Sequence, residues 1–111
     1  MEFEIQNLDH VKIISLSGDL NANTAGEAET KLIQLIMGGN RKLIVDLEQL
    51  NYISSAGLRI FLAANKLVKK MDGEIRFCSL NRTVLEVFDI SGFNMIFKFY
   101  PDQASAIQGF H

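Results

Sequence analysis

Two adjacent serines, Ser54 and Ser55, are the residues of this chain whose type and position best suit chemistry. They follow a continuous apolar run at residues 43–47, which is typical of a buried strand. After them, apolar residues recur at helical spacing over residues 58–71. The serines are therefore expected at a helix N-terminus, where free backbone N–H groups and the helix dipole favour negative charge. A phosphate on either hydroxyl would change the surface and leave the fold intact.

The same serines also suit a purely structural role. Serine is a favoured N-cap residue, and a cap of this kind stabilises a helix by about 1 kcal/mol. The small residues that follow, Ala56 and Gly57, leave the hydroxyls approachable by another protein. From the residues alone, a cap and a modification site both stay open.

Groups that could complete an enzyme active site are few. The histidines, His10 and His111, lie in a predicted turn and at the C-terminus, and neither flanks the serines. Residues 53–57 lack the first glycine of a G-x-S-x-G elbow, so a serine hydrolase is only a minor rival hypothesis. Asp46 lacks the acidic pair expected before the phospho-acceptor of a receiver domain. The chain also lacks zinc-site spacing and Gly-rich phosphate loops, so we predict no enzymatic activity, metal or cofactor.

Composition limits the class of protein. The chain has 111 residues, of which 48% are hydrophobic and 22% charged, so we predict one globular domain over residues 1–111. A net charge of -2 argues against nucleic acid or an anionic membrane as the main partner. There is no apolar run of about 20 residues and no signal-peptide pattern, which makes a cytoplasmic location the default. Cys78, the single cysteine, is expected to be a buried, inert thiol.

Periodicity and turn signals predict strands and helices in the first half of the chain. Two strands are expected before the first helix, the second ending at Gly18. Thr24 and Glu27 have capping-box spacing at the start of that helix, and two glycines at 38–39 end it. The buried strand at 43–47, a loop over 48–53 and a helix from about Ala56 follow.

The second half continues the alternation. We predict a strand over 74–79, a third helix capped by Asn81 and a last strand over 96–100. Pro101 suits the first turn of a C-terminal helix. Interleaved elements of this length imply an α/β domain with a mixed four- to five-stranded sheet and about four helices.

The second helix has two clear faces and an ambiguous flank. Its core face contains Ile60, Phe61, Ala64, Leu67, Val68 and Met71, and Arg59, Lys66 and Lys70 lie opposite. Leu58 and Leu62 fall between these faces. They either pack under the third helix or form an apolar partner patch beside Ser55, which projects toward the same side as Leu62 and Arg59.

Over nearly its whole length the chain resembles STAS domains of the anti-sigma factor antagonist type. The resemblance is carried by the order and spacing of several segments: Gly18-Asp19-Leu20, residues 43–47 through 52–58, residues 88–93 and residues 96–98. It implies a single STAS-like domain.

The resemblance also implies a function, that of an anti-sigma factor antagonist. A serine at this helix start is expected to be phosphorylated by a serine kinase that is also the anti-sigma factor, and a PP2C-type phosphatase removes the phosphate. The dephosphorylated form binds the kinase and frees a sigma factor. The match of Ser-Ala-Gly-Leu to the acceptor motif assigns phosphorylation to Ser55, with Ser54 as second candidate. The expected partner-binding residues are Asn21, Ser54, Ala56, Gly57, Leu58, Arg59 and Leu62.

Two positions depart from the family pattern. Many members have aspartate where this chain has Ser54, and an aspartate is also common at the position of Asn21. Ser54 is therefore a cap, a substitute for the carboxylate or a second acceptor. Serine at both 54 and 55 also permits an alternative function, a STAS scaffold subunit of a transporter or signalling complex without phosphorylation.

Overall fold

The computed structural model describes residues 1–110, and His111 lies outside the described residues. Along the chain the helices and strands are β1 (Glu2–Leu8), β2 (Val11–Leu20), α1 (Ala25–Met37), β3 (Lys42–Asp46), β4 (Leu50–Ile53), α2 (Ser55–Lys70), β5 (Glu74–Cys78), α3 (Arg82–Ile90), the 3-10 helix η1 (Phe93–Met95), β6 (Lys98–Tyr100) and α4 (Gln103–Ile107). Among these residues, no helix is both long enough and apolar enough to cross a membrane.

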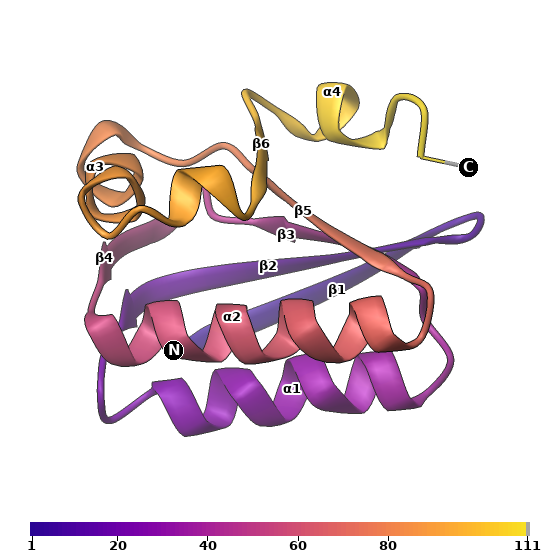
Figure 1. Ribbon diagram of the computed structural model, residues 1–111, viewed down its shortest axis with the longest axis horizontal. Helices are drawn as coiled ribbons and strands as arrows, with labels where there is room; N and C mark the ends of the chain where they lie inside the picture. Colours follow the sequence, from indigo (N-terminus) through magenta and orange to yellow (C-terminus); the bar gives the residue numbers. More distant parts are fainter. Residues whose placement is uncertain (111) are drawn as a thin grey trace.

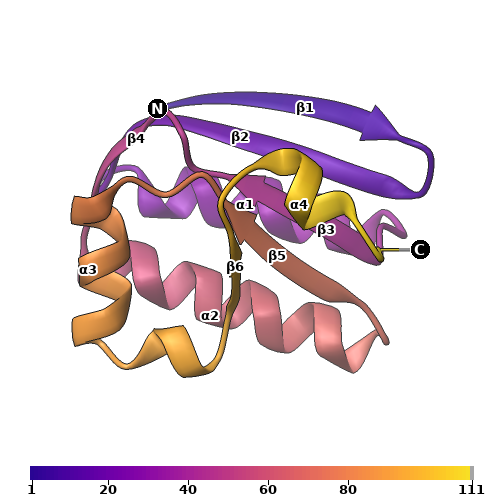
Figure 2. The ribbon, with the colours of Figure 1, turned by 90° about the horizontal axis from the view of Figure 1, so that it is seen from above.

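The strands form a mixed sheet in the order β1-β2-β3-β5-β6, with β4 paired to β2 outside this order. β1 and β2 are antiparallel, and the other pairs are parallel. The helices α1 and α2 lie side by side on one face of the sheet, α4 lies on the other, and α3 stands beside β4 (Figures 1 and 2). The predicted α/β class is confirmed. The sheet has six strands, slightly more than predicted.

The additional strand is β4, so the prediction of a loop over 48–53 is wrong. β2 is ten residues long, and its pairing with β3 ends at Ser15. The last residues of β2 are therefore free to pair with β4. In β4, Leu50 and Ile53 are buried while the two residues between them are exposed. This pattern lacks the strict alternation that identifies a half-buried strand in a sequence.

The main core lies between the sheet and the helices α1, α2 and α3. Phe61, Phe77 and Phe88 come from α2, β5 and α3, and all three are fully buried. The rings of Phe61 and Phe77 meet edge to face with centroids 5.0 Å apart, a favourable geometry for aromatic pairs. The aromatic cluster therefore joins the strand β5 to the helices α2 and α3.

A smaller cluster lies under α4 on the opposite face, and its polar anchor is Arg76. The Nη1 group of Arg76 donates hydrogen bonds to the carbonyl oxygens of Ala106 (2.8 Å) and Gln108 (3.0 Å). Its Nε donates to Oε2 of Glu74 at 2.8 Å, and its guanidinium lies 4.1 Å from the ring centroid of Phe110. A buried guanidinium with these partners holds the C-terminal segment against β5.

Glu74 and Cys78 show how this face affects ionisation. Partial burial opposes ionisation of Glu74, but the hydrogen bonds and charges of Arg76 and Lys98 hold the pKa of its carboxyl below the usual value. Burial raises the pKa of the Cys78 thiol to about 11. Cys78 has no exposed surface, which confirms the predicted burial of this cysteine.

Two details of the helix termini differ from the sequence prediction. Thr24 is the N-cap of α1, but its side chain makes no capping hydrogen bond. Its Oγ1 instead donates to the carbonyl of Asp19 at 2.8 Å and accepts from the N–H of Asn21 at 2.9 Å. Pro101 precedes the N-cap of α4, which is Asp102. By contrast, Asn81 caps α3 as predicted, accepting from the N–H of Val84 at 2.8 Å.

Replacing Arg76 with alanine should destabilise the domain by about 3 kcal/mol, because Glu74 loses its closest partner and two carbonyls lose their donor. Lys98→Ala removes the exposed member of the same ion-pair group and should cost less than about 1 kcal/mol. Urea unfolding of both variants measures the difference. Equal losses would show that Arg76 does not anchor α4.

Candidate functional site

Ser54 and Ser55 lie where β4 passes into α2, at the end of β2. The Cα of Ile53 is in register with that of Leu20, the last residue of β2. The backbone N–H of Ser54 then donates to the carbonyl of Leu20 at 2.9 Å. Strand pairing therefore sets the position of both serines before the helix begins.

Ser54 is the N-cap of α2. Its backbone is extended (φ -100, ψ 175), and its side-chain oxygen accepts from the N–H of Gly57 at 3.4 Å. Its carbonyl accepts from the N–H of Leu58 at 3.0 Å, the first bond of the helix. The half-buried Ser54 hydroxyl thus has a structural role, which is the capping alternative drawn from the sequence.

Ser55 is the first residue of α2, and its side chain is exposed. Within the described residues, the backbone N–H groups of Ser55 and Ala56 have no acceptor. The first turn of α2 carries no acidic residue. Arg59 is exposed and lies four residues after Ser55, one helical turn along the same face. Negative charge added at Ser55 would meet free donors, the positive end of the helix dipole and a guanidinium.

Gly57 brings α2 unusually close to the strands. A Cβ at this position would lie 2.8 Å from Cγ1 of Ile53, 2.8 Å from Cγ of Leu20 and 2.9 Å from Cδ2 of Leu20. Real Cβ atoms do not approach carbon atoms this closely, so a side chain here would push the helix start away. Gly57 therefore contributes to the site by its lack of a side chain.

Replacing Gly57 with alanine should destabilise the domain by about 1–3 kcal/mol, although alanine favours helices, because Leu20 and Ile53 must move. Gly26→Ala is the matched control, since Gly26 also lies in the first turn of a helix and nothing is within 4 Å of its Cβ position. We expect this control to be neutral or to stabilise by up to about 1 kcal/mol. Thermal unfolding compares the two, and a stable Gly57→Ala variant would contradict the close packing.

The side chains of Asn21 and Thr24 form hydrogen bonds within the loop after β2. Oδ1 of Asn21 accepts from the N–H of Asn23 at 2.9 Å and from that of Thr24 at 3.2 Å. These bonds hold the half-buried Asn21 in its own turn, adjacent to Leu20. Asn21 therefore shapes the edge of the site through the loop, and no hydrogen bond joins it to Ser54 or Ser55 within the described residues.

The core face of α2 follows the sequence prediction closely. Ile60, Phe61, Ala64 and Val68 are buried, and Leu67 and Met71 pack against the core while partly exposed. Leu58 retains only 4% exposure and belongs to the same core, so its side chain is packed inside and does not form an exposed patch. Leu62 is partly buried, Ala56 is half-buried and Arg59 is exposed.

The flank of α2 that contains Leu58 and Leu62 faces the C-terminal part of the sheet. Asn65 and Lys69, on this flank, line a small hollow together with Ile96 and Lys98. A helix-period pattern shows which residues share a flank, but it does not show what covers that flank. This is why the sequence left Leu58 undecided.

Tyr52 is a surface residue of the site that the sequence reasoning did not single out as a partner contact. It lies on β4 two residues before the N-cap, and 50% of it is exposed. An exposed tyrosine beside a candidate docking site is notable because aromatic residues are enriched in protein interfaces. The sequence of residues 48–53 resembles a loop, and this pattern conceals the exposed position of Tyr52 on a strand.

The structure separates the serines from His10, the one histidine among the described residues. His10 lies in the turn between β1 and β2, at the opposite end of the sheet from the start of α2 (Figure 1). Within residues 1–110, no three or more potential metal-ligating side chains come together. The site therefore offers an exposed hydroxyl at the start of α2, remote from His10.

Ser54→Ala should lower the free energy of unfolding by about 1 kcal/mol, because the N–H of Gly57 loses its cap. Ser55→Ala should change it by less than about 0.5 kcal/mol, because the exposed hydroxyl makes no hydrogen bond within the described residues. Urea denaturation of the two variants distinguishes these roles. A reversed order would mean that Ser55 is the structural serine.

Comparison with known proteins gives a consistent family. A family model described as the STAS domain matches residues 2–106. The protein BtrV of Bordetella bronchiseptica, named as a candidate anti-sigma factor antagonist, is 36% identical over 110 residues, which cover 99% of this chain and 95% of BtrV.

Solved structures share the fold. The crystal structure of TM1081 from Thermotoga maritima, also named as a candidate anti-sigma factor antagonist, matches with a TM-score of 0.92 at 21% identity, covering 97% of this chain and 93% of that one. The unphosphorylated anti-sigma factor antagonist SpoIIAA matches with a TM-score of 0.81 at 19% identity, over 96% of this chain and 95% of SpoIIAA. The phosphorylated form of SpoIIAA from Bacillus matches with a TM-score of 0.73 at 20% identity, over 96% of both chains.

Proposed function

Because the chain belongs to the STAS family, we propose that it is an anti-sigma factor antagonist controlled by phosphorylation of Ser55. The dephosphorylated form binds an anti-sigma factor that is also a serine kinase, and this binding frees a sigma factor. A PP2C-type phosphatase restores the binding form. The role requires no catalytic activity of this chain and would be exercised in the cytoplasm.

The exposed position of Ser55 at the first residue of α2 is the observation that carries this proposal. Ser54 already serves as the cap, so the neighbouring hydroxyl is free for modification. Ser55 also heads the Ser-Ala-Gly-Leu sequence, and a serine is the acceptor in the family pattern that this sequence resembles. The existence of SpoIIAA in phosphorylated and unphosphorylated forms supports a switch of the same kind.

Simple electrostatics explains how such a switch would work. Phosphorylation adds about −1.5 to −2 charges, which the N-terminus of α2 accommodates without unfolding the domain. The same charge at an interface must be desolvated against the partner, and this could cost several kcal/mol of binding energy. Phosphorylation therefore acts on the interface and leaves the fold intact.

The docking surface follows from the exposure of the predicted residues. Asn21, Ser54, Ala56, Arg59 and Leu62 retain exposed surface around Ser55. Gly57 and Leu58 are buried and support this surface from below, through close packing and core contacts. The proposed interface therefore contains fewer residues than the sequence predicts, because the buried Gly57 and Leu58 do not contact the partner directly.

Incubation with the cognate kinase and ATP, followed by mass spectrometry, tests the acceptor. We expect one phosphate on Ser55, retained in Ser54→Ala and lost in Ser55→Ala. Phosphate on another residue of the unmodified chain would refute the assignment. An absence of phosphate, with kinase binding retained, would instead favour the scaffold alternative.

The binding half of the proposal is tested with Ser55→Asp. This substitution should weaken binding to the kinase by at least about tenfold, equivalent to about 1.4 kcal/mol. Ser91→Asp is the control, because Ser91 is exposed at the C-cap of α3 and is not among the proposed docking residues, so this variant should bind as the unmodified chain does. Equal affinity of all three proteins would contradict a switch at Ser55.

A further inference from the structure

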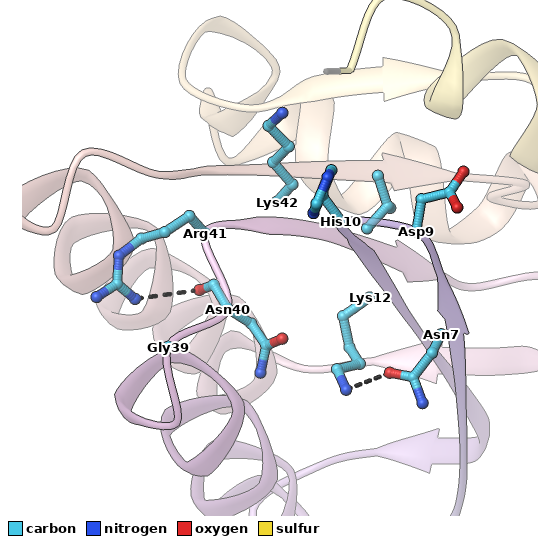
Figure 3. A pocket seen from close by; sticks show the side chains of 9 residues that line it. Asn7, Asp9, His10, Lys12, Gly39, Asn40, Arg41 and Lys42 are labelled. Atoms are coloured by element: carbon cyan, nitrogen blue, oxygen red, sulfur yellow. Dashed lines mark hydrogen bonds between the residues drawn. The ribbon is translucent and has the colours of Figure 1, made fainter.

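The end of the molecule opposite Ser55 has a hollow of about 490 Å³ with a basic lining. It lies between the β1–β2 turn, the loop after α1 and the start of β3 (Figure 3). Lys12, Arg41 and Lys42 are its permanently charged cations, His10 adds a titratable ring, and Asp9 is the only carboxylate among the described residues that line it. Three cations against one carboxylate stand out in a chain whose net charge is -2.

These cations have no carboxylate partners in the part of the chain that the structure describes. The ion pairs found there join Glu74 to Arg76 and Lys98 only. Nζ of Lys12 donates to the amide oxygen of Asn7, and Nη1 of Arg41 donates to the carbonyl of Ile36 at 3.0 Å. Both are neutral acceptors, so neither cation is neutralised by an ion pair within the described residues.

Two neighbouring hollows set the limits of this surface. One, of about 250 Å³, shares Arg41 and Lys42 and includes Asp72 and Glu74, which end the basic region on that side. The other, of about 470 Å³, shares Asp9, His10 and Val11 and is otherwise lined by Leu8, Ile107 and Phe110. A basic hollow therefore adjoins an apolar one across the β1–β2 turn.

The cationic side chains do not converge on one point. In Figure 3, Lys42 and His10 extend to one side of the sheet end, while Lys12 and Arg41 extend to the other. A single phosphate is bound best where donors converge at one position. Positive groups spread over several ångströms instead match carboxylates spaced along a polypeptide.

We propose that this end of the domain, formed by residues 9–12 and 40–42, docks an acidic segment of a partner protein. The carboxylates of the segment would lie over Lys12 and Lys42, and a bulky apolar side chain beside them would enter the hollow lined by Leu8 and Phe110. Because the lysines are flexible and partly solvated, the interaction should be weak and sensitive to salt.

This surface is independent of the proposed switch. α2 separates the two ends of the domain, and its 16 residues span about 24 Å. A charge at Ser55 lies beyond the Debye length at physiological salt, so its effect here should be negligible. A partner could therefore occupy this end in either phosphorylation state.

The test uses a fluorescent peptide in which pairs of glutamates alternate with leucine, and the 111-residue chain labelled with ¹⁵N. We expect chemical shift changes confined to residues 7–12, 39–42 and the lining of the apolar hollow. The double variant Lys12→Glu/Lys42→Glu should bind the peptide at least about tenfold more weakly, as measured by fluorescence anisotropy. The control is Lys66→Glu/Arg82→Glu, at exposed positions of α2 and α3 that line none of these hollows, which makes the same change in net charge and should bind normally.

Three outcomes would overturn the proposal. Shift changes spread over the whole surface, or an equal loss in the control variant, would show non-specific charge attraction. Inorganic phosphate or triphosphate that reproduces the shifts and displaces the peptide would identify a small-anion site instead. The amide spectrum of the double variant verifies its fold, and Ser55→Asp should bind the peptide normally whether or not Ser55 proves to be phosphorylated.

Discussion

The pairing of β4 with the last residues of β2 is the constraint on which the site depends. It aligns Ile53 with Leu20 and gives the N–H of Ser54 a strand carbonyl to bond. Gly57 then lets α2 begin within van der Waals contact of both strand residues. With the backbone fixed on two sides, Ser54 must cap the helix and Ser55 must face outward. An exposed hydroxyl on a rigid support is well suited to recognition by a second protein.

The domain has two ends and two faces with different chemistry. The end at the start of α2 presents a hydroxyl and a helix N-terminus, whereas the opposite end presents three cations beside one carboxylate in the described part of the chain. One face of the sheet is covered by long helices over a phenylalanine-rich core. The other is covered by the short α4, which a buried arginine holds in place. Separate surfaces of this kind let a small domain bind different partners without direct competition.

Sequence patterns were most successful where a local signal specifies a local structure. The α/β alternation, the core face of α2, the Asn81 cap and the burial of Cys78 were all predicted correctly. Sequence patterns failed for β4, because two exposed residues between two buried ones resemble a loop. They also failed for Thr24, whose hydroxyl bonds to the Asp19 carbonyl instead of capping its own helix. In the first case the partner is a strand distant in the chain, and in the second it is a carbonyl only five residues earlier.

The sequence by itself determined the class of fold, the start of α2 at two serines and the family pattern that singles out Ser55, because these depend on periodicity, capping chemistry and residue order. Only the tertiary structure decided which serine caps, that Leu58 is buried, and that cations from β2, β3 and the loop after α1 share one hollow. These features arise from pairing and packing between segments distant in the chain. A local pattern contains no record of which distant segment will cover a given flank.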